Sequence, residues 1–347
     1  MSLAALSSTP IARPAKRPSC EKNHAPRVTR RTDCHRFLLS YHSLRSGVAM
    51  GVSPRSEGDT KMDRALLVGI GNYGRLGQPL PGCANDLAGW GSCVAANIAA
   101  GSGNLRARAD TQATRDTLID DFGWLLSDAK PGDQRVFFFA GHGARVRRRD
   151  PDTGATEAIL SETLVTYPVA SEGRETHMIF DRDLAELIDA VEFPASARLT
   201  MVIDACHSGG MARRLGDEED GPLVRCMSFP DEEEDEARAR EFNVAEVRPF
   251  GSAIVEAVPR DFSVEAAPAS RVLVAAASAE QRAWDDRMPN GKRHGIFSYY
   301  ALQAIATQPQ MSFDALIAAI TPPISQRFPQ RPMLLGDTGR FSGHIFN

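Results

Sequence analysis

Two short stretches of the sequence place a thiol and an imidazole where they could act together. Cys206 follows the apolar run 199–203 and His142 follows the aromatic run 136–139, and small residues beside each mark the end of a strand. In open α/β sheets, ligands bind in the crevice beyond the carboxyl ends of the strands. There an imidazole can accept the proton of a thiol and leave a nucleophilic thiolate. The pair therefore predicts thiol catalysis, although a lone Cys206 would more often be a buried structural cysteine.

The base and the oxyanion donors can be assigned from strand geometry. His207 is also near the thiol, but adjacent residues of a strand point to opposite faces, which favours His142 as the base. The glycines beside His142 let backbone N–H groups approach a carbonyl oxygen, so we expect the N–H groups of Gly143 and Cys206 to form an oxyanion hole. A serine hydrolase built on Ser208 is a weaker alternative, because no Gly-x-Ser-x-Gly sequence surrounds it.

The patterns around these motifs predict alternating strands and helices. The expected elements are strands at 65–70, 135–140 and 199–204, and helices at 83–97, 114–126 and 181–191. Thr114 and Asp181 are the expected N-caps, and the basic run 145–150 is an expected exposed loop. A last core strand at 272–277, helices at 297–305 and 312–320, and a strand at 333–335 follow. This order is typical of a three-layer α/β/α sandwich with a mostly parallel central sheet.

Composition bounds the class of protein. The 347 residues are 42% hydrophobic and 24% charged, with a net charge of −4 that gives no hint of nucleic-acid binding. No run of eighteen apolar residues exists, so we expect no membrane span. The six cysteines form no Cys-x-x-Cys pair in a chain too large to need disulfides, which favours a reducing compartment such as the cytoplasm.

The chain divides into a basic leader and one larger domain. Residues 1–61 carry eleven Lys and Arg against four Asp and Glu, and we expect them to be disordered. They fit a transit-type leader, a basic interaction tail, or sequence upstream of a true start at Met50 or Met62. The Cys and His residues of this segment lack zinc-finger spacing, so no metal is assigned there: Cys20, His24, Cys34, His35 and His42. The domain 62–347 would comprise 62–210, an acidic linker at 211–259, and 260–347.

Three ordered motifs resemble those of the caspase-like cysteine peptidases, clan CD, family C14. They are Gly141-His142-Gly143, the run from Asp204 to Gly209, and Gly82-Cys83-Ala84-Asn85-Asp86. The resemblance is strongest to the metacaspase and bacterial orthocaspase branch and extends from about Arg64 to the C-terminus. It implies a caspase-hemoglobinase-like fold and cysteine-type endopeptidase activity. True caspases carry Gln-Ala-Cys-x-Gly, and Asp204 and His207 depart from that pattern.

That departure bears on the residue at the cleaved bond. Asp204 lies two residues before Cys206, so it shares the same face of the strand, and an acidic group there would attract Arg or Lys. The resemblance implies that Asp86 joins Asp204 in an acidic substrate pocket and that Ser278 borders the substrate. Ordinary structural roles stay open: a first-turn helix acid for Asp86, a hydrogen-bonded strand-end carboxylate for Asp204, and a plain strand-end serine for Ser278.

The resemblance also implies a calcium site, for which the match is imperfect. The family's Pro-Val-Asp pattern is Pro168-Val169-Ala170 here, and its paired acids are Asp181-Arg182-Asp183. A lost carboxylate and an added cation weaken a site for a hard cation. We therefore expect no required cofactor, at most weak calcium dependence, and a helix-capping role for Asp181.

The acidic insert has two interpretations. It is either a solvated linker or a processing loop whose arginines would suit an enzyme that cuts after basic residues: Arg213, Arg214, Arg225, Arg238 and Arg240. The sequence therefore predicts a cysteine endopeptidase that acts on proteins or peptides after Arg or Lys through Cys206 and His142, with possible processing of itself. The alternative is a catalytically silent caspase-homology module that serves as a scaffold or regulatory partner.

Overall fold

In the computed structural model, every described helix and strand lies between Arg64 and Arg340. The described residues are 61–74, 76–98, 103–149, 156–168, 177–207, 221–227, 229, 247–248, 250–256 and 270–346. The expectations for the basic segment, for Ser208 and for most of the acidic insert fall on residues outside these ranges. Within them, no helix is both long and apolar enough to cross a bilayer.

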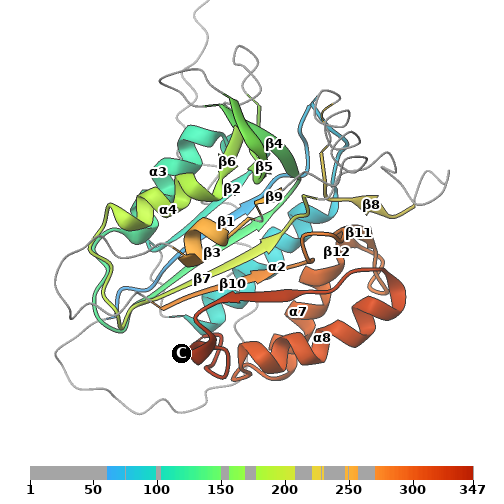
Figure 1. Cartoon of the computed structure of the whole chain (residues 1–347). Helices are drawn as coiled ribbons and strands as arrows, with labels where there is room; N and C mark the ends of the chain where they lie inside the picture. Colours follow the sequence, from blue (N-terminus) through green and yellow to red (C-terminus); the bar gives the residue numbers. More distant parts are fainter. Residues whose placement is uncertain are drawn as a thin grey trace, which may run out of the picture. The chain divides into compact units, whose positions relative to one another are not determined.

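Six strands form the central sheet, in the order β13-β10-β7-β3-β1-β2 (Figure 1). Their bounds are β1 Arg64–Gly69, β2 Leu105–Ala109, β3 Gln134–Ala140, β7 Arg198–Asp204, β10 Ser270–Ala275 and β13 Met333–Gly336. All neighbouring strands are parallel except β13, which runs antiparallel to β10. Strands buried on both faces are nearly continuous apolar runs, and β1, β3 and β7 have that pattern. The predicted mostly parallel sheet is confirmed.

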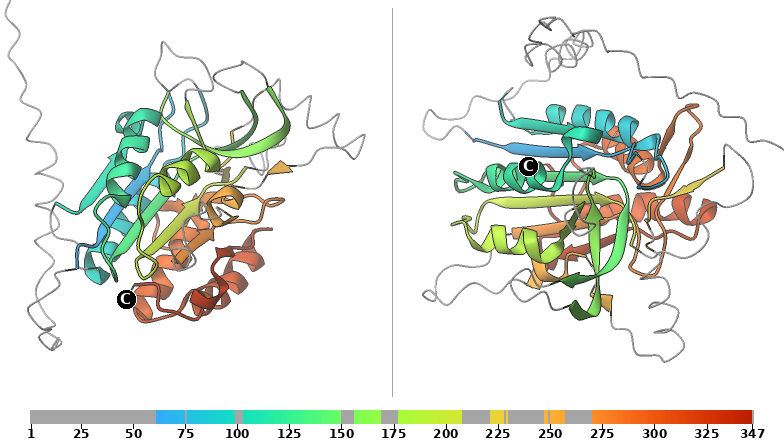
Figure 2. Two further views of the ribbon diagram at one scale, coloured as in Figure 1. Left: turned by 60° about the vertical axis from the view of Figure 1, so that its left-hand side comes forward. Right: turned by 90° about the horizontal axis from the view of Figure 1, so that it is seen from above.

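Helices cover both faces of this sheet (Figures 1 and 2). On one face lie α3 (Arg115–Leu126) and α4 (Asp181–Asp189), and on the other lie α2 (Gly82–Asn97), α7 (Ile296–Thr307) and α8 (Phe313–Arg327). The alternation along each strand explains the two layers of core, since Leu66 and Phe137 join the α3 side while Leu67 and Phe138 join the α2 side. The predicted three-layer α/β/α sandwich is confirmed.

Two smaller sheets lie beside the main one. In the first, β4 (Gly143–Arg149), β5 (Thr156–Val165) and β6 (Met178–Phe180) pair in that order, and β9 (Val247–Arg248) pairs with β5. In the second, β8 (Leu223–Val224) and β12 (Arg293–Gly295) flank β11 (Trp284–Arg287). The expected exposed loop at 145–150 is wrong over its described part, because β4 pairs along the segment and Arg145 forms an ion pair with Glu162 at 3.0 Å.

The helix boundaries confirm some expectations and correct others. Thr114 is the N-cap of α3, as predicted. Asp181 is the first residue of α4 rather than its N-cap, and its Oδ2 instead accepts from the N–H of Ala253 at the start of α6 (Ser252–Glu256). Helix α8 continues past 320 to Arg327 through two prolines. Ile320 and Ile324 both pack in the core, so packing outweighs the missing amide donors.

Two short 3-10 helices, Asp110–Gln112 and Thr338–Arg340, complete the described elements. The acidic insert, expected to lack regular structure, contains β8, β9 and α6 in its described parts.

Candidate active site

The carboxyl ends of β3 and β7 bring the thiol and the imidazole motifs together. Ala140, the last residue of β3, pairs with Asp204, the last residue of β7. His142 and Cys206 each follow two residues after the end of their strand. His142 and Cys206 are 1% and 2% exposed. The backbones approach closely enough that a Cβ on Gly143 would lie 2.5 Å from the carbonyl oxygen of Cys206. Glycine at 143 is therefore required by space.

The ring and the backbone of His142 are each held by a residue that the sequence analysis did not single out. Its Nε2 lies 2.7 Å from the carbonyl oxygen of Gln78, and its backbone N–H donates to the Tyr73 hydroxyl at 2.8 Å. A carbonyl oxygen only accepts, so Nε2 carries the hydrogen and Nδ1 is the basic nitrogen of the neutral ring. Burial raises the pKa of Tyr73 well above its usual value, which keeps the hydroxyl protonated. A backbone carbonyl has no side-chain signature, so Gln78 could not be found from the sequence.

The second histidine contacts β5 and also packs against Gly143, where a Cβ would lie 2.6 Å from the Cδ2 atom of its ring. Nδ1 of His207 lies 3.2 Å from Glu162 Oε2, and its ring stacks on Phe250. Burial alone would raise the pKa of Glu162, but His207 and Arg145 hold it below its usual value. His207 is thus engaged by an ionised carboxylate of β5.

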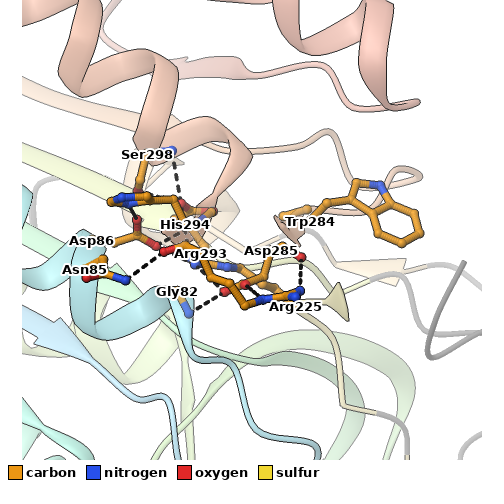
Figure 3. Close-up of polar contacts among 12 residues, drawn as sticks. Gly82, Asn85, Asp86, Arg225, Trp284, Asp285, Arg293, His294 and Ser298 are labelled. Carbon is orange, nitrogen blue, oxygen red and sulfur yellow. Dashed lines mark hydrogen bonds and ion pairs between the residues drawn. The ribbon is translucent and has the colours of Figure 1, made fainter. Parts of the chain in front are cut away.

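Three carboxylates converge on the guanidinium of Arg225. Figure 3 labels two of the acids, Asp86 and Asp285. Asp204 Oδ2 lies 3.1 Å from Nη1, Asp285 Oδ2 lies 3.1 Å from Nη2, and Asp86 forms a short ion pair with the same Nη2. All four side chains have no exposed surface. Asp86 and Asp204, which the sequence analysis placed in one acidic pocket, lie together; Asp285 is a third acid that it missed.

Each carboxylate of this acidic pocket is held by further donors. Asp86 accepts from His294 Nδ1 and from the Gly295 N–H, both at 2.9 Å. Asp204 accepts from Ser298 Oγ at 2.6 Å and from the Ser298 N–H at 3.2 Å. Asp285 accepts from the Gly82 N–H at 3.0 Å and from Arg293 Nε at 3.1 Å. These donors come from the start of α2, from β12 and from the first turn of α7 (Figure 3). The pocket is therefore preorganised to hold negative charge away from water.

Burial and the neighbouring charges together shift the pKa values of Asp204 and Arg225. Burial raises the pKa of the Asp204 carboxyl to about 6, although Arg225 opposes that shift. Burial alone would lower the pKa of Arg225, but Asp204, Asp86 and Asp285 raise it well above its usual range. The guanidinium is therefore permanently charged, and it is surrounded by three carboxylates.

The main chain of Arg225 lies where a reacting peptide group would be expected. Its carbonyl oxygen accepts from the N–H groups of Gly143 and Cys206, both at 3.1 Å, which are the two donors that the sequence analysis nominated for an oxyanion hole. Its own N–H donates to the Ala283 carbonyl at 2.9 Å, and that carbonyl also lies 3.7 Å from Cys206 Sγ. One residue thus contacts the acidic pocket, both predicted donors and the surroundings of the thiol.

The residues on either side of Arg225 are also paired. Leu223 and Val224 pair antiparallel with Asp285 and Trp284, and Met227 N–H donates to the Gly143 carbonyl at 2.8 Å. The described residues 221–227, which we call the inserted segment, therefore run as an added strand across the strand ends. This is how extended peptides bind at sheet edges.

The structure places Ser278 and the described residues of the expected calcium site away from these contacts. Ser278 follows β10 and lines a groove with Thr321 of α8 and Leu334 of β13, and within the described residues no hydrogen bond links it to Arg225. For calcium, Asp183 pairs with Arg115 at 3.0 Å, and the described ranges contain no group of three His, Cys, Asp or Glu arranged to hold a metal. Val169 and Ala170 lie outside those ranges.

Residues 63–213 match the model of the metacaspase, peptidase C14 domain. Metacaspase-1 of Ajellomyces capsulatus is 26% identical over 316 residues, covering 83% of each chain. Metacaspase-2 of Trypanosoma brucei brucei is 34% identical over 157 residues, covering 43% of this chain and 42% of its own. The crystal structure of protein GSU0716 from Geobacter sulfurreducens superimposes with a TM-score of 0.53 at 19% identity, over 82% of this chain and 98% of that one, which shows a shared fold.

Proposed function

We propose, from the match of residues 63–213 to the metacaspase, peptidase C14 domain and from the distant homology to fungal and trypanosomal metacaspases, that the chain is a cysteine endopeptidase that cleaves after arginine or lysine. Cys206 would be the nucleophile and His142 the base. Gly143 and Cys206 would supply the oxyanion hole, and Asp86, Asp204 and Asp285 the pocket for the basic side chain.

One observation carries this proposal: Arg225 occupies the site as a substrate residue would. Its guanidinium lies in the acidic pocket and its carbonyl oxygen lies on the two backbone donors. An arginine that only neutralised buried acids would have no need to place its carbonyl oxygen on those donors. The same observation supports self-processing at the bond between Arg225 and Cys226.

The arrangement supports a two-step acyl transfer. His142 Nδ1 takes the thiol proton, and the Cys206 thiolate attacks the carbonyl carbon of the arginine. The negative charge that forms on its oxygen is stabilised by the N–H groups of Gly143 and Cys206. His142 then gives its proton to the leaving amine as the C–N bond breaks and a thioester remains. Water, deprotonated by His142, attacks the thioester, releases the arginine carboxylate and restores the thiol.

Self-cleavage of the full chain tests the proposal directly. The wild type should yield fragments 1–225 and 226–347, identified by mass spectrometry from a new N-terminal Cys226. Cys206→Ala and Arg225→Gln should remain intact, whereas Arg225→Lys should still be cut. Cys93→Ala is the matched control, because Cys93 is a half-buried thiol on α2 that the proposed mechanism does not use.

A reporter peptide ending in Leu-Val-Arg, cleaved by the wild type but not by Cys206→Ala, gives the same answer with a separate substrate. Equal fragmentation and equal peptide turnover in both would favour the silent scaffold, in which Arg225 is a permanent structural cation.

We further propose that turnover needs no calcium and that the protein works in a reducing compartment such as the cytoplasm. Arg182 lies between the two acids of the family's paired position, and Asp183 is already engaged by Arg115. Cys83, Cys93 and Cys206 are thiols outside any disulfide bond. Peptide turnover with and without a chelator tests the first point, and complete loss in chelator would contradict it.

A further inference from the structure

Met227, the second residue after the Arg225–Cys226 bond, is buried beside the catalytic histidine. Its side chain is 6% exposed and belongs to the same apolar cluster as Tyr73 and Ala144. Cys226, between Met227 and Arg225, is only half-buried. Beyond the cleaved bond, the site therefore encloses Met227 far more than Cys226.

Gly77 forms one wall around the Met227 side chain. A Cβ built on Gly77 would overlap the terminal methyl group of Met227 and would lie 3.6 Å from two atoms of the His142 ring. Gly77 is absent from the residues with positive φ, so its backbone conformation is open to any residue. Space for the methionine, rather than backbone strain, explains glycine at this position.

Main-chain bonds fix which residue reaches this wall. The N–H of Gly143 donates to the Arg225 carbonyl and the carbonyl of Gly143 accepts from the Met227 N–H, so a single residue holds both sides of the cleaved bond. A peptide of any sequence can form these bonds, because they involve no side chain. They would place the residue two positions beyond the cut against Gly77, and the side chain there would then decide the fit.

We propose that the site has an apolar subsite, walled by Gly77 and His142, that selects a long unbranched apolar side chain two residues after the cleaved bond. Its substrates are then proteins with arginine followed, two positions later, by methionine or a side chain of similar length. This inference rests on the proposed function and adds a second element of specificity to it.

A set of internally quenched peptides tests the subsite. Each carries the sequence Gly-Pro-Leu-Val-Arg-Ser, followed by Met, Ala or Asp and a common tail. With the full wild-type chain, kcat/KM for the Met peptide should exceed that for the Ala peptide about tenfold, and that for the Asp peptide by more. Gly77→Ala should bring the Met-to-Ala ratio close to one. Gly123→Ala is the matched control, since a Cβ there meets no atom within 4 Å, and it should keep the wild-type ratio.

The outcomes separate this inference from the function that it rests on. If the wild type cleaves no peptide, the proposed function fails. If it cleaves all three after arginine at the same rate, the peptidase stands and the subsite is refuted. If Gly77→Ala lowers all three rates by one factor and keeps the ratio, Gly77 is only structural and the subsite is again refuted. The wild-type ratios decide the question even if Gly77→Ala does not fold.

Discussion

The ends of β3 and β7 and the acidic pocket are assembled in opposite ways. At the strand ends, Cys206 and His142 belong to short local motifs, and one parallel register aligns them. In the pocket, Arg225 meets Asp86 across 139 positions and Asp285 across 60, through a strand of two residues and a hairpin. Under the proposed function, the sheet would therefore position the reacting groups, whereas selectivity would depend on small elements added beside it.

Because of this difference, we expect substitutions in the two regions to change different kinetic parameters. Changes at the strand ends should act on the chemical step and lower kcat. Changes in the pocket should act on the binding of the basic side chain and raise KM.

The largest effect is expected at the strand ends. His142→Ala should lower kcat for an arginine peptide about 10⁴-fold with little change in KM, because the base and acid of both steps is lost. His207→Ala is the control and should stay within about tenfold, since Glu162 engages that ring on β5. Steady-state kinetics measure both, on chains cut between Arg225 and Cys226 by a trace of wild-type enzyme. If His207→Ala is the more damaging change, the assignment of the base is wrong.

In the pocket, Asp285→Asn should raise KM for arginine peptides about a hundredfold and change kcat little. A buried charge pair is lost there, and such losses are large. The adjacent Asp286→Asn is the control, because Asp286 pairs with the half-exposed Arg327 instead. A parallel loss in both variants would mean that the hairpin is only structural and would remove the contrast between the two regions.

The pH dependence should differ between the regions as well. Burial raises the pKa of Asp204 to about 6, although Arg225 opposes the shift. Below that pH the carboxyl is neutral and attracts a cation less, so kcat/KM should rise from pH 5 to 7.5. The advantage of wild type over Asp204→Asn should grow about tenfold over that range. An advantage independent of pH would show that Asp204 does not titrate in binding.

The smallest effect is expected at Ser298, which supports the pocket from α7. Its Oγ donates to Asp204 at 2.6 Å and favours the ionised carboxylate. Ser298→Ala should therefore move the acid limb of kcat/KM to higher pH and lower Tm by a few degrees, from a loss of about 1–2 kcal/mol. Ser325→Ala removes a single hydrogen bond from α8 to Gln330 and should leave the acid limb in place.

The core of the fold was predictable because its strands are buried on both faces. The apolar runs of β1, β3, β7 and β10 are unmistakable in the sequence, and a parallel sandwich follows from their order. β2 was missed because Leu-Arg-Ala-Arg-Ala carries charge in an edge strand. Its two arginines pair with Asp121 at 2.6 Å and 2.5 Å, a partner on α3 that no local pattern reveals.

The site was predictable only where its residues sit in local motifs. Asp86 and Asp204 lie within such motifs, whereas Asp285 is one of two adjacent acids on a short strand, and only strand pairing decides which one faces inward. Arg225 was one of five arginines considered in and beside the insert. The choice among them depends on the hydrogen bonds of Val224 and Met227 with distant residues, which the sequence does not encode locally.

The place of β10 has a consequence for any break in the inserted segment. β10 pairs with β7 from Ser270 to Ala275 and lies between β7 and β13. The pieces before and after Arg225 therefore share one sheet and one core, and a nick at that bond would release neither. A nicked sample should separate into two bands in detergent yet elute as a single particle from a gel-filtration column, so chromatography alone would not distinguish it from the uncut chain.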